Sequence, residues 1–167
     1  MYPQPPLFSE ILPNLFMGGT DDDDVTHIPA RIYNRKNGLP FDAIVTMYEF
    51  ARPAFGGVQE FRYAVPDAEM ANISLDRLRD AVEFAHARWK AGDRVLIRCQ
   101  AGLNRSGLVT ALVLIKEGHD PKAAIDLLRT KRDRDALCNE DFAEWLLEAG
   151  HEFFQPLSTS QSGLADW

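Results

Sequence analysis

The chain has 167 residues, with 18 Lys and Arg against 25 Asp and Glu and a formal net charge of −7. This length is typical of one domain with its own core, and the acidic balance argues against a general nucleic-acid-binding protein, which would carry a basic face. Because the two cysteines make no disulfide framework and no apolar run approaches the roughly eighteen residues of a membrane span, we expect a cytoplasmic chain without a membrane partner.

The first part of the chain predicts three short strands. The apolar residues of segment 9–19 indicate a short strand or hairpin that ends at a Gly-Gly break. The apolar run 41–47 predicts a buried strand, and segment 61–65 alternates well enough for another. The proline-rich residues 1–7 are expected to form a flexible lead-in.

One helix, one strand and a second helix follow. Ser74 is a predicted N-cap of a helix that continues to about Ala91, with apolar residues at helical spacing. Segment 95–97 is apolar without polar alternation, as expected of a strand covered on both faces. Segment 108–115 is apolar almost all round, which is typical of a helix in a core.

The C-terminal part predicts two further helices and a tail. Pro121 stands at a first helical position, and Asn139 can cap the last helix. Residues 155–167 are polar and rich in serine, so a flexible tail is expected. The alternation of strands and helices predicts an α/β fold. We expect a twisted central, mostly parallel sheet of four or five strands with helices on both faces, in one domain over residues 8–154.

The segment from Asp93 to Gly118 reads as strand, tight loop and helix, with Cys99 and Arg105 in a C-x5-R spacing between strand and helix. Such a loop can point consecutive backbone N–H groups into one concavity, where the helix dipole adds positive potential. Gly102 can supply the positive φ that the turn needs. The arrangement favours a thiolate at Cys99, the form of cysteine that acts as a nucleophile.

The same loop predicts a phosphate site. Arg105 can bind two phosphate oxygens with its planar guanidinium group, and the hydroxyl of Ser106 can hydrogen-bond the thiolate. The predicted phosphate-binding residues are Gln100, Ala101, Gly102, Leu103, Asn104 and Arg105. The four histidines are far apart in the sequence, so no zinc spacing exists and no metal or other cofactor is expected.

The sequence C-Q-A-G-L-N-R-S-G, from Cys99 to Gly107, resembles the signature loop of the cysteine-dependent protein tyrosine phosphatase superfamily, in its compact dual-specificity branch. Segment 11–18, Ile-Leu-Pro-Asn-Leu-Phe-Met-Gly, is similar to the start of the sheet in that branch. The resemblance implies a protein tyrosine phosphatase-like fold and a metal-independent phosphatase.

Such a reaction needs an acid, because a departing alkoxide or phenoxide is a poor leaving group unless it is protonated. Val65-Pro66-Asp67 resembles the acid loop of the family, so Asp67 is the predicted general acid. Glu69 is the reserve candidate. The alternative is that Asp67 is an ordinary acidic residue of a surface turn.

Two positions extend or depart from the family pattern. The family has His directly before the nucleophile, whereas this chain has Arg98, whose charge could favour the thiolate by attraction but cannot reproduce the hydrogen bonds of a neutral imidazole. Asn139 and Phe142 resemble the family's Asn-x-x-Phe segment, so Asn139 could brace the signature loop in addition to capping a helix. A regulatory disulfide between Cys99 and Cys138 is a further possibility.

Other residues carry weaker hypotheses. Phe50, Arg52 and Phe55 lie in a loop that often lines the substrate entrance in the family, although ordinary loop residues are the simpler interpretation. The four consecutive acids of segment 21–24 lack the alternating ligands and glycine of an EF-hand loop, so they indicate a solvated segment and not a calcium site.

The predicted function is a phosphomonoesterase with a phosphocysteine intermediate. It would act on phosphotyrosine, with phosphoserine and phosphothreonine as further substrates, so the expected partner is a phosphorylated protein or peptide. Three alternatives stay open. A weakly active pseudophosphatase would bind phosphopeptides without turnover, a related phosphatase would act on phosphoinositides or RNA 5′-triphosphates, and a rhodanese-like domain would transfer sulfur without needing Asp67.

Overall fold

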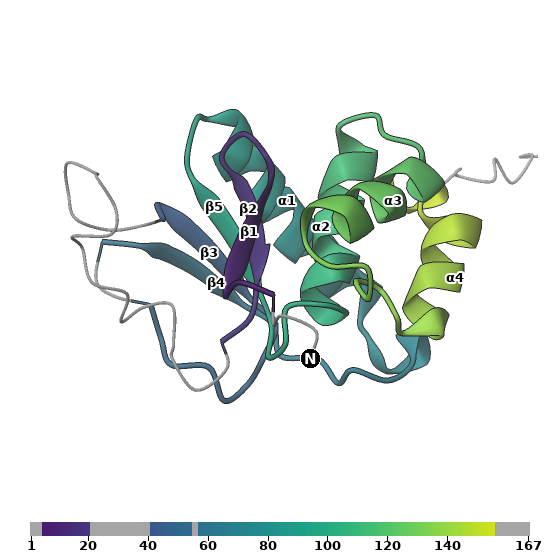
Figure 1. Ribbon diagram of the computed structural model, residues 1–167, viewed down its shortest axis with the longest axis horizontal. Helices are drawn as coiled ribbons and strands as arrows, with labels where there is room; N and C mark the ends of the chain where they lie inside the picture. The colour runs from purple at the N-terminus through teal and green to yellow at the C-terminus, as the bar shows by residue number, and fades with distance from the viewer. Residues whose placement is uncertain (1–4, 21–40, 55–56, 156–167) are drawn as a thin grey trace, which may run out of the picture.

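A computed structural model describes residues 5–20, 41–54 and 57–155 (Figure 1). The predictions for segment 21–24 and Phe55, and those for the tails within residues 1–4 and 156–167, lie outside these residues. The elements are, in chain order, β1 (Phe8–Leu12), β2 (Leu15–Gly18), β3 (Ala43–Thr46), β4 (Gln59–Arg62), the 3-10 helix η3 (Met70–Asn72), α1 (Leu75–Lys90), β5 (Val95–Arg98), α2 (Arg105–Lys116), α3 (Pro121–Lys131), α4 (Glu140–Ala149) and the 3-10 helix η4 (Glu152–Phe154).

The five strands form one sheet in the order β1-β2-β5-β3-β4. Strands β1 and β2 are an antiparallel hairpin whose turn places Asn14 at a φ of 69°, a conformation that Asn tolerates better than most residues. The pairs β2–β5, β5–β3 and β3–β4 are all parallel. The predicted α/β class and mostly parallel sheet are therefore confirmed.

The register brings the carboxyl ends of four parallel strands to one edge of the sheet. Gly18 is opposite Arg98, Arg98 is opposite Thr46, and Thr46 is opposite Arg62. The loops that follow these four residues therefore gather at the same edge. This edge is where ligands bind in open α/β sheets.

The two faces of the sheet are covered differently. One face contributes Met17, Val45 and Ile97 to a large core that includes the apolar residues of all four α-helices. The other face contributes Phe16, Ile44 and Leu96 to a small cluster of strand and loop residues. Among the described residues all α-helices thus cover one face, as Figure 1 also shows, whereas helices had been expected on both faces.

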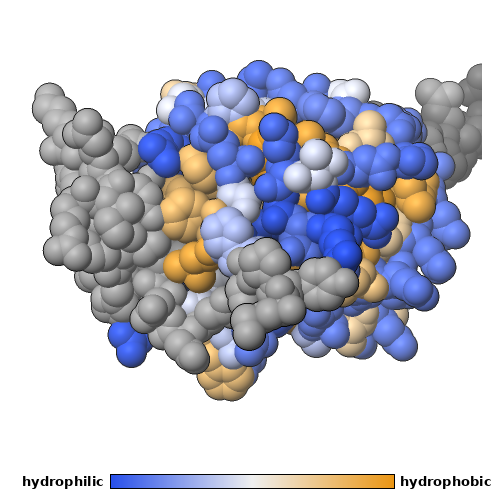
Figure 2. Space-filling model, in the orientation of Figure 1, coloured by the Kyte–Doolittle hydropathy of each residue, from blue (hydrophilic) through white to orange (hydrophobic). Residues whose placement is uncertain are grey.

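A run of hydrophobic residues in the sequence could not reveal that the described helices cover only one face of the sheet. Strands that are buried on both faces look alike in sequence whether a helix or a loop covers them. Hydrophilic residues cover most of the described part of the face in Figure 2, and hydrophobic residues appear there in smaller patches. Within residues 5–20, 41–54 and 57–155, no helix is both long and apolar enough to cross a membrane.

Helix starts agree with the expected caps. The side chains of Ser74, Asp120 and Asn139 each accept a hydrogen bond from the backbone N–H three residues later. The predicted strand at 61–65 instead lies at Gln59–Arg62, because pairing with β3 ends at Arg62. The chain beyond leaves the sheet and leads toward Asp67.

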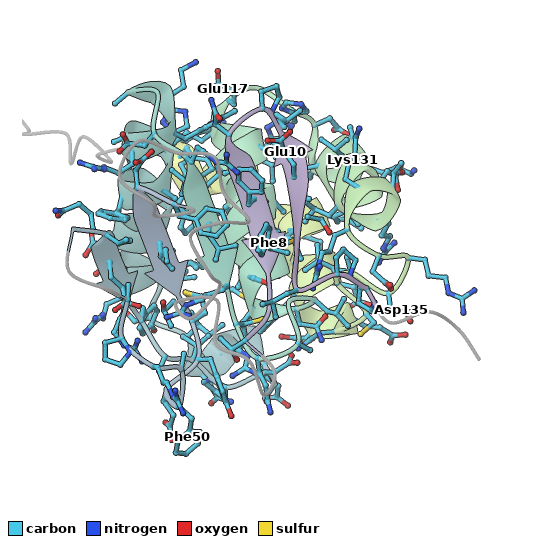
Figure 3. All side chains as sticks on the ribbon, turned by 60° about the vertical axis from the view of Figure 1, so that its left-hand side comes forward. Phe8, Glu10, Phe50, Glu117, Lys131 and Asp135 are labelled. Carbon is cyan, nitrogen blue, oxygen red and sulfur yellow. The ribbon has the colours of Figure 1, made fainter. Side chains whose placement is uncertain are left out.

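Glu117 joins α1 to the end of α2, far from the edge where the four strands end (Figure 3). Its carboxylate oxygens lie 2.7 Å from Lys90 Nζ and 2.7 Å from His86 Nε2. Hydrogen bonds from Lys90 and His86 lower the pKa of Glu117 below its ordinary value of 4.5. This pair therefore stabilises the fold above pH 4.5, and the contribution is lost as the pH falls through the lowered pKa.

We predict that Glu117→Gln lowers the free energy of unfolding by about 0.5 kcal/mol at pH 7, the scale of a partly exposed ion pair. The difference from wild type should shrink as the pH falls from 4.5 through the lowered pKa of Glu117, because the wild-type carboxylate then becomes neutral as well. Urea unfolding at several pH values measures both the loss of stability at pH 7 and its dependence on pH. Glu144→Gln is the control, since Glu144 is exposed on α4; an equal loss in both variants would contradict the assignment.

Candidate active site

The signature loop, residues 99–105, connects β5 to α2 and packs backbone to backbone on the end of β2. Gly102 has a φ of +74°, and a Cβ on it would lie 2.4 Å from the carbonyl carbon of Gly18. A Cβ on Gly19 would lie 2.6 Å from the carbonyl oxygen of Gln100. Glycine is therefore required on both sides of this contact, by backbone conformation at Gly102 and by space at both positions.

The carbonyl groups of the signature loop are held by residues behind it. Gly102 O accepts from Arg132 Nε at 3.1 Å, and Leu103 O accepts from Leu137 N at 3.1 Å. The remaining contacts are Ala101 O with Arg132 Nη2 at 3.4 Å and Gln100 O with Thr20 N at 2.9 Å. Arg132 also donates to Pro6 O and Ser9 Oγ, so it ties the loop to the residues that precede and begin β1.

This anchoring decides where the amide groups point. In a trans peptide the C=O of one residue and the N–H of the next point in opposite directions. Four consecutive carbonyls directed toward Thr20, Arg132 and Leu137 therefore direct the next four N–H groups, those of residues 101–104, toward the opposite side. Such a row of N–H groups suits an oxyanion, and its binding by residues 100–105 stays a prediction.

Cys99 lies at the start of this loop with only 2% of its surface exposed. Its Sγ is 3.2 Å from Oγ of Ser106, which is fully buried in the first turn of α2. A hydroxyl at this distance can donate to a thiolate and can stabilise it as a leaving group. The predicted pairing of nucleophile and hydroxyl is therefore present in the geometry.

Arg105 begins α2 and keeps part of its guanidinium group available. Nη1 donates to Val65 O at 3.2 Å, and the guanidinium carbon lies 5.2 Å from the ring centroid of Tyr48. Nε is buried and has no hydrogen-bond partner among the described residues. Buried donors are normally paired, so this N–H fits an anionic ligand bound beside the loop.

Two asparagine amides hold Asp67, one from the signature loop and one from the N-cap of α4. Asn104 Nδ2 donates to Oδ2 of Asp67 at 3.0 Å, and Asn139 Nδ2 donates to Oδ1 at 2.8 Å. Asn139 also donates to Ala68 O at 2.9 Å and caps α4 through Phe142 N. Asn139 thus caps α4 as expected, and its contact with the signature loop is a hydrogen bond from its backbone N–H to Oδ1 of Asn104 at 2.9 Å. Asp67, and not Glu69, accepts a hydrogen bond from the signature loop.

A pocket of about 300 Å³ opens beside Arg105. Its walls come from the loop after β3 and from the segment that leads to Asp67, and its lining residues are Tyr48, Glu49, Phe50, Ala64, Val65, Pro66 and Arg105. Phe50 is 75% exposed and projects from its loop in Figure 3. The sequence suggests Phe50 for this entrance but not Tyr48, whose contact with the Arg105 guanidinium group has no sequence signal.

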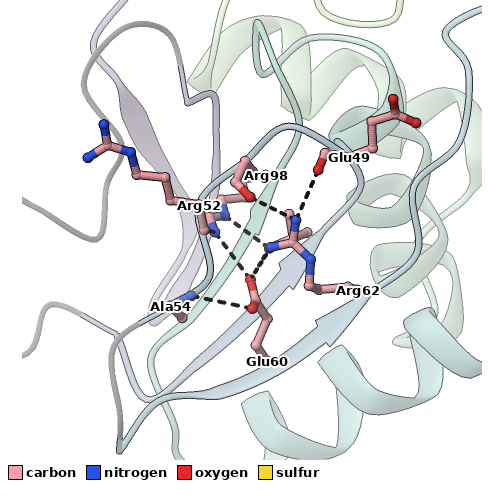
Figure 4. Close-up of polar contacts among 8 residues, drawn as sticks. Glu49, Arg52, Ala54, Glu60, Arg62 and Arg98 are labelled. Atoms are coloured by element: carbon pink, nitrogen blue, oxygen red, sulfur yellow. Dashed lines mark hydrogen bonds and ion pairs between the residues drawn. The ribbon is translucent and has the colours of Figure 1, made fainter.

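Arg98 does not face the nucleophile. Successive strand residues point to opposite faces, so Cys99 packs with the helices while the Arg98 side chain is buried on the other face of the sheet. There Nε donates to Thr46 Oγ1 at 3.0 Å, and Nη2 lies 3.2 Å from Glu60 Oε2 (Figure 4). The hydrogen bonds of its guanidinium group therefore lie on the face of the sheet opposite Cys99, and an effect of its charge on the thiolate stays a prediction.

Both cysteines are free thiols. Cys138 is exposed, and its Sγ lies 3.5 Å from Nδ2 of Asn104, one of the two amides that hold Asp67. Within the described residues, no group of three or more His, Cys, Asp or Glu side chains could hold a metal ion. The roles of Cys99, Arg105, Asp67 and Ser106 in catalysis stay predictions that need chemistry to test them.

Residues 31–152 match the family described as "Dual specificity phosphatase, catalytic domain". The match spans well over half of the chain, including Asp67, the signature loop and all four α-helices. It supports the resemblance that the loop sequence indicated.

Two curated relatives carry the name dual specificity protein phosphatase 22. The protein from Xenopus tropicalis is 28% identical over 150 residues, which cover 88% of this chain and 67% of that protein. The protein from Mus musculus is 27% identical over 126 residues, covering 74% of this chain and 64% of that protein. The chain therefore spans about two thirds of the length of these relatives.

Solved structures share the fold at low sequence identity. "Tk-PTP in the active form" has a TM-score of 0.67 at 23% identity, covering 91% of this chain and 99% of that one. Human DUSP28 has a TM-score of 0.65 at 22% identity, covering 93% and 100%. PTPMT1 in complex with PI(5)P has a TM-score of 0.68 at 21% identity, covering 89% and 97%.

These comparisons confirm the predicted relationship, the phosphatase-like α/β fold and the enzyme class, a cysteine-dependent protein phosphatase of the dual-specificity type. They do not assign residues to steps of the reaction, which rests on the geometry described above. The chain belongs to the dual specificity phosphatase catalytic domain family.

Proposed function

We propose that this chain hydrolyses phosphate monoesters of proteins through a phosphocysteine intermediate on Cys99. The observation that carries the proposal is the surroundings of the buried Cys99 thiol. The carbonyl groups of residues 100–103 are hydrogen-bonded behind the signature loop, and the buried Nε of Arg105 has no hydrogen-bond partner among the described residues. A phosphoryl group bound there would meet the amide groups of residues 101–104 and the guanidinium group of Arg105.

In the first step the Cys99 thiolate attacks phosphorus and the bond from phosphorus to the substrate oxygen breaks. Asp67 in its protonated form gives its proton to that oxygen, so the alcohol or phenol leaves neutral. Its hydrogen bonds to Asn104 and Asn139 hold the carboxyl group over the signature loop.

In the second step water attacks the phosphorus of the thiophosphate bond. Asp67, now a carboxylate, accepts a proton from the water, and the Cys99–phosphorus bond breaks to give inorganic phosphate and the thiolate. The Ser106 hydroxyl, 3.2 Å from Sγ, stabilises the departing thiolate by donating to it. Release of the phosphate then returns the enzyme to its starting state.

Phosphotyrosine is the proposed substrate group. The pocket beside Arg105 has Tyr48, Phe50, Val65 and Pro66 in its lining, which suits an aromatic ring. Glu49 also lines the pocket, and no Lys does, which disfavours a substrate with several phosphates. The phosphoinositide in the PTPMT1 structure belongs to that protein, so a phosphoinositide is kept as a competing substrate in tests.

The proposal also includes a reducing compartment such as the cytoplasm. A working thiolate is lost when it is oxidised, and Cys99 and Cys138 are both free. Fractionation of cells that produce the protein tests this location.

We predict that Cys99→Ser lowers kcat/KM for p-nitrophenyl phosphate on the order of 10⁴-fold or more, because a serine hydroxyl cannot replace a thiolate nucleophile here. Acid quenching with ³²P-labelled phosphotyrosine peptide should trap label on the wild-type chain and none on the variant. Cys138→Ser is the matched control and should keep activity within about 3-fold, since Cys138 touches no reacting atom.

The same assay separates the alternatives when it is run in EDTA. A wild-type chain that binds phosphotyrosine peptide without turnover would be a pseudophosphatase, and persulfide on Cys99 after thiosulfate would indicate sulfur transfer. Faster turnover of a phosphoinositide or of triphosphate RNA than of the peptide would overturn the proposed substrate.

We predict that Asp67→Asn lowers kcat for phenyl phosphate about 100-fold or more, the usual scale of general acid catalysis. The loss should be smaller for p-nitrophenyl phosphate, whose leaving group needs less protonation. Glu69→Gln is the control; a larger loss in that variant would transfer the role to Glu69.

A further inference from the structure

Arg98 belongs to a buried ionic cluster whose other members come from neighbouring strands. Its side chain is fully buried, and the Glu60 side chain is 13% exposed. Glu60 Oε2 accepts hydrogen bonds from Thr46 Oγ1 at 2.6 Å, Arg98 Nη2 at 3.2 Å and Arg62 Nη1 at 3.2 Å. One carboxylate oxygen thus joins β3, β4 and β5 on the face away from the helices (Figure 4).

The cluster also fastens the loop that follows β3, residues 47–54, which we name the pocket loop. Arg98 Nη2 donates to Arg52 O at 2.7 Å, and Arg62 Nη2 donates to Ala51 O at 2.8 Å. A second carboxylate oxygen, Glu60 Oε1, accepts from Ala54 N at 3.3 Å. Three charged side chains therefore hold three successive parts of the pocket loop by its backbone.

The pocket loop forms one wall of the site. Tyr48, Glu49 and Phe50 line the 300 Å³ pocket, and the Tyr48 ring lies under the guanidinium group of Arg105. Phe50 contacts Tyr48 edge to face, with 5.7 Å between ring centroids, but is itself 75% exposed. Tyr48 packs against the core, but Phe50 does not, so the position of the outer part of this wall depends on the backbone contacts of the pocket loop.

We propose that Arg98, together with Glu60 and Arg62, is a positioning residue for substrate recognition: the ionic cluster holds the pocket loop in place for the aromatic part of a phosphotyrosine substrate. The inference deepens the proposed function and rests on it. A preorganised wall lowers the entropy lost when the substrate binds, so the cluster acts on KM and not on the step at Cys99.

Arg98→Met tests the inference through two ligands that use different parts of the site. KM for a phosphotyrosine peptide should rise about 10-fold while kcat changes less than about 3-fold, because only binding of the ring depends on the pocket loop. The inhibition constant of inorganic phosphate should change less than about 2-fold, since phosphate needs the signature loop and Arg105, which is also held by Val65 O outside the pocket loop.

Arg94→Met is the matched control. Arg94 immediately precedes β5, its guanidinium carbon lies 4.7 Å from the Phe16 ring on the same face of the sheet, and it is at the end away from the site. The substitution Arg94→Met removes one positive charge from that face, as Arg98→Met does, and should leave KM within about 2-fold of wild type.

Arg62→Met covers the case in which loss of the buried Arg98 prevents folding. The Arg62 side chain is 34% exposed, so its removal leaves the core intact, and KM should rise about 3-fold. In both variants hydrogen exchange of the Ala51 and Ala54 amides should become about 10-fold faster, because their loop opens more often, with little change elsewhere.

Unchanged KM and unchanged exchange of the pocket loop in Arg62→Met and Arg98→Met would overturn the inference. A fall in kcat together with a weaker inhibition by phosphate would also overturn it, because Arg98 would then act on the signature loop. Hydrogen exchange needs no turnover. A wild-type chain without activity would therefore count against the proposed function, while a loop that exchanges at the wild-type rate in both variants would count against this inference alone.

Discussion

The close backbone contact between the signature loop and the Gly18-Gly19 pair is the constraint on which the rest of the site depends. A Cβ at Gly102 would come within 2.4 Å of Gly18, so this approach is possible only for glycine. It brings the end of β2 against the loop, where Thr20 and Arg132 can hold the carbonyl groups. With the carbonyls held behind, the amide groups and the Cys99 thiol share the other side of the loop.

The two faces of the sheet have separate tasks in this arrangement. The face covered by helices carries Cys99 and packs it beside the fully buried Ser106. The opposite face carries Arg98 and Glu60, whose contacts run to the pocket loop. Both sets of residues act at the same edge because the parallel strands end in register. The proposed chemistry and the proposed recognition are thus supported from opposite sides of one strand, β5.

Much of the fold follows from local sequence. The caps at Ser74, Asp120 and Asn139 and the apolar segment 95–97 depend on residues close in the chain. They lie where the sequence places them, with segment 95–97 inside β5. The coverage of the second sheet face did not follow, because apolar strand residues do not reveal what packs on them. Neither did the end of β4, which is set by its pairing with β3.

The candidate site divides in the same way. The sequence by itself determined Cys99, Gly102, Arg105 and Ser106 as one unit, because their chemistry depends on a short loop with fixed spacing, and it singled out Asp67 by its loop. Only the tertiary structure decided that Asn104 and Asn139 hold Asp67, that Tyr48 lies at Arg105, and that Arg98 faces away from the thiol. Each of these contacts joins residues far apart in the chain or depends on the alternation of side chains across a sheet, and neither is visible until the strands are paired.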